Sequence, residues 1–90
     1  MKLSILDQGP ISNGQKPQKA LENMREAVKL ADKLGYHRFW FAEHHNTEGF
    51  ASSAPEISMA HLAGQTEKIR LGSGGTMMMH YSPYKMAETF

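Results

Sequence analysis

The chain has 90 residues, 40% of them hydrophobic and 21% charged, a composition typical of one small globular domain at most. Ten lysines and arginines are scattered among nine aspartates and glutamates, and this formal net charge of +1 without a basic stripe excludes a nucleic-acid partner. With no cysteine for disulfides or zinc–thiolate sites, and no apolar run near the roughly 20 residues of a membrane span, we expect a cytoplasmic protein with no membrane partner.

The first third of the sequence predicts a strand followed by a long helix. Residues 2–7 form a short apolar stretch that ends in a Gly-Pro turn and are predicted to form a strand. Apolar residues recur at steps of three and four over 17–34, which predicts a helix with one buried face. The positions in this stripe are Ala20, Leu21, Met24, Ala27, Val28, Ala31 and Leu34. Pro17 opens the helix, Gly35 closes it, and Tyr36 is placed to pack back on the last turn.

The middle of the sequence predicts a second strand and a second helix. A strand is predicted over 38–42, because after Arg38 residues 39–42 are a continuous apolar run without alternation, which is typical of a strand covered on both faces in a parallel sheet. Ser53 and Glu56 have the spacing of a capping box, in which a serine oxygen and a glutamate satisfy the free amides at a helix start. We therefore expect a helix near 54–65.

The last part of the sequence predicts a third strand near 69–73 and a third helix that begins at Ser82-Pro83. Strands and helices thus alternate, which predicts an α/β fold with parallel strands and right-handed crossovers. A doubly wound sheet and an eight-stranded barrel share this opening, and the local pattern does not separate them. Because Phe90 follows soon after the third helix begins, we expect a truncated chain, a single partial domain over 1–90.

Candidate catalytic residues follow the second predicted strand, where function gathers in parallel α/β folds. These residues are Glu43, His44 and His45. Adjacent histidines point to opposite sides of an extended chain, so at most one of them can face a central cavity. Histidine transfers protons near neutral pH, and Glu43 is placed to hold the tautomer of the working histidine. The alternative is a polar strand end that satisfies loop backbone, and a zinc site is disfavoured because neighbouring histidines do not converge on one metal ion.

Glycines follow the third predicted strand at Gly74 and Gly75, with Thr76 after them. They lack the lysine of a phosphate-binding loop, and two readings stay open: a plain turn, or a backbone that a flat ligand approaches closely. The three methionines at 77–79 are interpreted as core filling or as the lining of an organic pocket. His80 and Tyr81 are interpreted as part of a solvated loop.

Two segments together resemble the bacterial luciferase-like flavin-dependent monooxygenases. Residues 39–48, which lead through aromatic residues into Glu-His-His, are similar to the second-strand segment of that family. Residues 69–77 followed by Ser82-Pro83 are similar to its third-strand segment, and the likeness extends over the whole chain.

The resemblance implies the N-terminal β-α-β-α-β portion of a TIM (β/α)8 barrel, that is, its first two and a half βα units. It also implies an enzyme that uses reduced FMN, supplied by a separate flavin reductase, to oxidise a small organic substrate with O2. Within this family pattern His44 is the catalytic acid or base, and Gly74, Gly75 and Thr76 lie at the flavin, with a cis bond between the two glycines in the complete barrel.

The resemblance also limits what these 90 residues can do by themselves. In barrels of this kind the cofactor phosphate is held by loops after the last strands, which lie outside this sequence. We therefore expect the 90 residues alone to be inactive, and to self-associate through uncovered sheet edges. Two alternatives remain: a stand-alone α/β module for binding or interaction, and a metal-dependent hydrolase that uses Glu43, His44 and His45.

Overall fold

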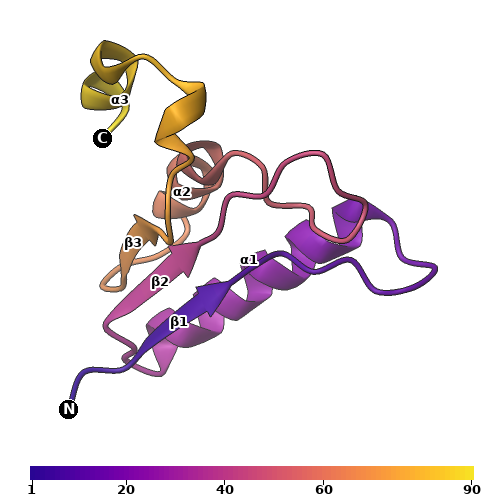
Figure 1. Cartoon of the computed structure of the whole chain (residues 1–90). Helices are drawn as coiled ribbons and strands as arrows, with labels where there is room; N and C mark the ends of the chain where they lie inside the picture. The colour runs from indigo at the N-terminus through magenta and orange to yellow at the C-terminus, as the bar shows by residue number, and fades with distance from the viewer.

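The chain folds into alternating strands and helices, and the computed structural model describes residues 1–90 (Figure 1). In chain order the elements are β1 (Ser4–Asp7), α1 (Pro17–Lys33), β2 (Arg38–Phe41), α2 (Pro55–Ala63), β3 (Arg70–Ser73), the short 3₁₀ turn η1 (Met78–His80) and α3 (Pro83–Thr89). The predicted strands and helices are all present. The five elements with predicted ranges are each one to three residues shorter than the sequence pattern indicated, and α3 begins at Pro83 as predicted. None of the helices has the length and apolar character needed to cross a membrane.

The three strands form one parallel sheet in the order β1-β2-β3, as predicted. The register places Ile5 beside Phe39 and Phe39 beside Leu71, so these side chains share one face of the sheet. Leu6, Trp40 and Gly72 are aligned in the same way on the opposite face. All three strands end at the same edge, where loops of β1, β2 and β3 meet.

The core lies between the sheet and the two longer helices, which both cover the same face. Its buried members are Met24, Val28 and Ala31 of α1, Phe39 and Phe41 of β2, Leu62 of α2, and Ile69. The predicted stripe of α1 therefore supplies the buried face, although Leu21 and Leu34 at its margins stay exposed. The rings of Phe39 and Phe41 lie 5.1 Å apart and are fully buried, which makes them the centre of this core.

The opposite face of the sheet has no layer packed against it, which corrects the prediction that β2 is covered on both faces. Leu6 is 54% exposed, and Trp40 is only half-buried. The guanidinium of Arg38 lies 4.7 Å from the centre of the Trp40 ring, a cation–π contact on this open face. Three strands do not close a barrel, so the face that points away from the helices has no partner within these residues.

The ends of the helices show where local sequence signals hold and where one fails. Gly35 has a φ of +80°, and the Tyr36 amide donates to the Ala31 carbonyl across the end of α1, as predicted for a left-handed helix stop. The capping box at Ser53 is wrong, because α2 begins one residue later, with Ala54 at the N-cap and no side-chain cap. At α3 the Ser82 hydroxyl does accept the Lys85 amide, at 3.1 Å.

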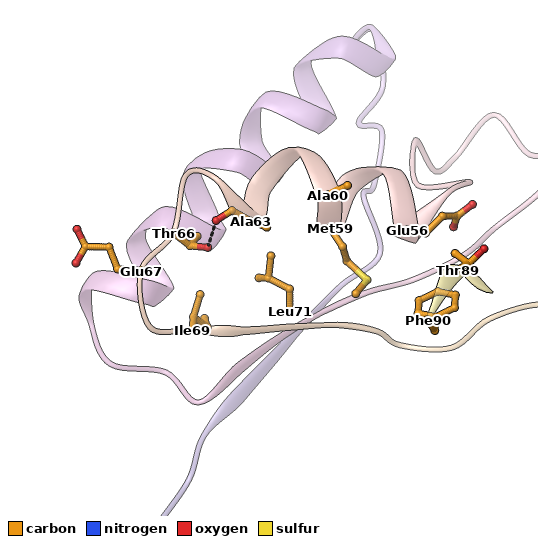
Figure 2. A pocket seen from close by; sticks show the side chains of 10 residues that line it. All are labelled: Glu56, Met59, Ala60, Ala63, Thr66, Glu67, Ile69, Leu71, Thr89 and Phe90. Carbon is orange, nitrogen blue, oxygen red and sulfur yellow. Dashed lines mark hydrogen bonds between the residues drawn. The ribbon is translucent and has the colours of Figure 1, made fainter. Parts of the chain in front are cut away.

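The methionines after β3 are exposed, so the core-filling interpretation of residues 77–79 is wrong for this chain. Met77 is 44% exposed and Met79 is 97% exposed, because η1 and α3 lie beyond the carboxyl ends of the strands and away from the core (Figure 1). An open groove of about 480 Å³ lies between α2, β3 and the C-terminal residue (Figure 2). Met59 from α2 and Leu71 from β3 line it from opposite sides, and Phe90 lies at one end.

Candidate functional site

A small open hollow of about 260 Å³ lies at the carboxyl ends of the three strands. The residues that line it are Leu6, Gln8, Ala42, Glu43, His44, Gly74, Gly75, Thr76 and Met77. Five of the six site residues predicted from the sequence therefore meet in one place. The exception is His45, which bonds to Glu43 but does not itself line the hollow.

His44 is held by its backbone and by one ring contact. Its amide donates to the Ser52 carbonyl at 2.8 Å, and its imidazole stacks on Phe50 with ring centres 4.4 Å apart and an angle of 23° between the planes. Nε2 of the half-buried ring is enclosed and has no hydrogen-bond partner. The ring therefore lies against the hollow without being committed to a polar group of the chain.

Glu43 is a buried carboxylate that ties two loops together. Its side chain is fully buried, and Oε2 lies 2.8 Å from Nε2 of His45, whose side chain is 38% exposed. The same oxygen accepts from the Met77 amide at 3.1 Å and from the Tyr81 hydroxyl at 3.3 Å, while Oε1 is enclosed without a partner. Glu43 thus orients His45 and not His44, since residues two apart on an extended chain point to the same side.

Tyr81 is part of this network, although the sequence placed it in a solvated loop. Burial, together with the neighbouring charge of Glu43, raises the pKa of Tyr81 above its ordinary value of 10.0. The phenol therefore stays protonated near neutral pH and donates to the carboxylate. The contact spans 38 residues of chain, and no local pattern around Tyr81 signals it.

The glycine segment differs sharply from one residue to the next. A Cβ at Gly74 would lie 2.6 Å from Leu6 Cδ1 and 3.1 Å from Trp40 Cβ, whereas a Cβ at Gly75 would meet nothing within 4 Å. Thr76 donates its hydroxyl to Ser73 Oγ, which in turn donates to the Gly75 carbonyl and so shapes the turn. All peptide bonds are trans, including the one between Gly74 and Gly75. The cis bond expected for the complete barrel stays a prediction.

Sequence reasoning also missed the loops that surround His44. The loops after β1 and β2 pair as a short antiparallel ribbon, with an isolated bridge between Pro10 and Phe50. The Ala51 amide donates to the Gly9 carbonyl at 2.8 Å, and the Ser52 hydroxyl donates to the Ala42 carbonyl. The Gly-Pro sequence signalled a turn at the end of β1 but not its pairing partner.

No three acidic or histidine side chains are arranged to hold a metal ion. The three residues of the zinc alternative diverge: Glu43 and His45 bond to each other, and the ring of His44 stacks on Phe50. Nothing in this arrangement favours the metal-dependent hydrolase.

The sequence is similar over its whole length to one family of known proteins. The sequence model of the luciferase-like monooxygenase family matches residues 1–90. An N-acetyl-S-alkylcysteine monooxygenase of Bacillus subtilis is 50% identical over 90 residues, which are 100% of this chain and 27% of that protein. The chain therefore spans about a quarter of the length of this curated relative.

Two solved structures have the same fold. The crystal structure of apo-MsnO8 matches with a TM-score of 0.95 and 48% identity, over 99% of this chain and 27% of its own. The oxygenating constituent of 3,6-diketocamphane monooxygenase from Pseudomonas putida, in complex with FMN, matches with a TM-score of 0.90 over 99% of this chain and 24% of its own. At 20% identity the second likeness concerns the fold alone.

Proposed function

The chain belongs to the luciferase-like monooxygenase family, and we propose that residues 1–90 supply the first two and a half βα units of an FMN-dependent enzyme that oxidises a small organic substrate with O2. The observation that supports this most is the hollow at the strand ends, which brings His44 together with Gly74 and Gly75. These are the residues that the family likeness assigned to proton transfer and to flavin contact.

The hollow suits the flat ring of a flavin but not its phosphate. The free space beside Gly75 leaves backbone open to a planar group, and Leu6 and Ala42 provide apolar surface. No lysine or arginine lines the hollow, so the phosphate needs a site elsewhere. Gly74, Gly75 and Thr76 would hold the ring edge. Reduced FMN would supply the two electrons that reduce one oxygen atom of O2 to water, while the other oxygen atom is transferred to the substrate.

His44 is proposed to move the proton that this chemistry requires. Neither ring nitrogen is hydrogen-bonded within the chain, and because Nε2 is enclosed, a ligand in the hollow would exchange the proton with the ring at Nδ1. Glu43 keeps His45 and the loop after β3 in place, because one carboxylate oxygen accepts from His45, the Met77 amide and Tyr81. This loop includes Gly75 and Thr76, which makes Glu43 a support for the flavin side of the hollow.

We also propose that the flavin is reduced by a separate reductase. The family resemblance implies such a reductase, and the hollow is open to solvent, so flavin reduced by another protein can enter it. An added reductase, or chemically reduced FMN, is therefore part of the assay below.

The proposal is tested with the protein expressed from its complete reading frame, reduced FMN and O2, by measuring product formation on candidate small organic substrates. We expect His44→Ala to lower kcat on the order of 10²- to 10⁴-fold, the usual loss for a proton-transfer group, with an unchanged circular dichroism spectrum. His61→Ala is the matched control, because His61 is exposed on α2 and contacts Gln65 outside the hollow. Full activity of His44→Ala would contradict the proposed role.

A further inference from the structure

Phe50 is the aromatic residue in contact with the ring of His44. The two rings are stacked, with centres 4.4 Å apart and an angle of 23° between their planes. Phe50 is half-buried and comes six residues later, in the loop between β2 and α2. The stack therefore depends on how that loop is folded, not on strand geometry at His44.

The loop that carries Phe50 is fixed by the ribbon with the loop after β1. Backbone hydrogen bonds join the Ile11 amide to the Gly49 carbonyl at 2.9 Å and the Ala51 amide to the Gly9 carbonyl at 2.8 Å, on either side of the Pro10–Phe50 bridge. Gly9 has a φ of +64°, and a Cβ there would lie 3.1 Å from Ser52 Cβ. The ribbon is thus closely packed at its base, and it presents Phe50 as a fixed surface.

His44 lacks the polar contact that usually orients a working histidine. In most sites one ring nitrogen donates to a carboxylate or a carbonyl, which sets the tautomer and the angle of the ring. Here the adjacent carboxylate of Glu43 forms its hydrogen bond with His45 instead, and Nε2 of His44 has no hydrogen-bond partner. The stack on Phe50 and the backbone bond to Ser52 are the contacts that remain to hold this ring.

We infer that Phe50 is a positioning residue for His44, holding the imidazole by stacking so that it meets the ligand in the hollow at a fixed angle. This inference rests on the proposed function, because it assigns to Phe50 an effect exerted through His44. A small error in the placement of a reacting group lowers rates steeply, so removal of the ring should matter although Phe50 is absent from the lining of the hollow.

The kinetic test is a double-mutant cycle in the protein from its complete reading frame, with reduced FMN and saturating substrate. We expect Phe50→Leu to lower kcat on the order of 10- to 100-fold. Phe50→Tyr keeps the ring and should therefore retain most of the native kcat. In the His44→Ala background Phe50→Leu should have no further effect. An equal loss in both backgrounds, or a fully active Phe50→Leu, would overturn the inference.

A second readout needs neither flavin nor turnover. The ring current of Phe50 should shift the imidazole proton signals of His44 in NMR spectra of the protein without cofactor, and these signals are identified by their loss in His44→Ala. The shift should vanish in Phe50→Leu and persist in Phe50→Tyr, and an unchanged shift in Phe50→Leu would refute the stack. If the shift behaves as expected but His44→Ala is fully active, the proposed proton transfer and the positioning role fail together while the stack stands. If His44→Ala is inactive and Phe50→Leu is not, the positioning role alone fails.

Discussion

At the scale of single residues, Gly72 and Gly75 show that glycines in one segment serve different purposes. A Cβ at Gly72 would lie 2.8 Å from Cε3 and Cζ3 of Trp40, so the indole ring covers this position on the open face of the sheet. A Cβ at Gly75 would meet nothing within 4 Å. Glycine at 72 is therefore required for packing, and glycine at 75 is free for another purpose, which we propose is contact with the flavin.

This difference predicts unequal effects of the same substitution. Gly72→Ala should lower the free energy of unfolding by about 1–3 kcal/mol, because the rigid Trp40 ring must shift. Gly75→Ala should change it by no more than about 0.5 kcal/mol, as at an unconstrained surface position. Urea unfolding of the two variants without flavin measures both values. Equal destabilisation would show that the Trp40 ring does not require the absence of a Cβ at 72.

At the scale of secondary structure, Asp32 fastens the end of α1 to the loop that leads into β3. Its carboxylate accepts the amides of Glu67 at 2.7 Å, Lys68 at 3.0 Å and Ile69 at 2.8 Å. These three hydrogen bonds hold the pKa of Asp32 below its ordinary value of 3.8, and the bond from the Glu67 amide has the largest effect. The contact joins elements more than 30 residues apart and fixes where β3 begins.

The lowered pKa predicts a pH dependence of stability. Because the folded-state pKa lies below the unfolded value, the carboxylate contributes its full stabilisation above pH 3.8 and loses it as the pH falls through the folded-state pKa. Asp32→Asn should have a lower urea midpoint than the native protein near neutral pH. This difference in urea midpoint should become smaller as the pH falls below 3.8 through the folded-state pKa of Asp32. Glu22→Gln is the control, since its exposed pair with Lys19 at 3.7 Å contributes little. A difference in urea midpoint that stays constant with pH would contradict this account.

At the scale of the whole molecule, apolar surface is left uncovered on both sides of the sheet. On the face opposite the helices Leu6 is 54% exposed, and at the groove between α2 and β3 Phe90 is 58% exposed. Both β1 and β3 are edge strands with free backbone groups. In a barrel of the kind its relatives form, further strands and helices would cover these surfaces.

We therefore predict that the 90-residue chain on its own self-associates. Sedimentation velocity over a range of concentrations should show species larger than the 10.1 kDa monomer, with the proportion rising as concentration rises. A compact monomer that persists at high concentration would instead support the alternative of a stand-alone α/β module.

The sequence by itself determined the order of elements, their parallel pairing and most members of the hollow. These follow from local signals: the apolar period over 17–34, the unbroken aromatic and apolar run at 39–42, and the rule that parallel strands present their loops at one edge. Even so, the capping box at Ser53 failed, because Ala54, the residue before Pro55, has a non-helical backbone and becomes the N-cap itself.

Only the tertiary structure decided which partners these residues have. Glu43 accepts from the Met77 amide and from Tyr81, and His44 stacks on Phe50, because the loops after β2 and β3 fold back over the strand ends. Such contacts join residues up to 38 positions apart, and they depend on side-chain shape and backbone pairing that no local period encodes. Local propensity is read along the chain, whereas the geometry of a site is set by what the chain brings together from a distance.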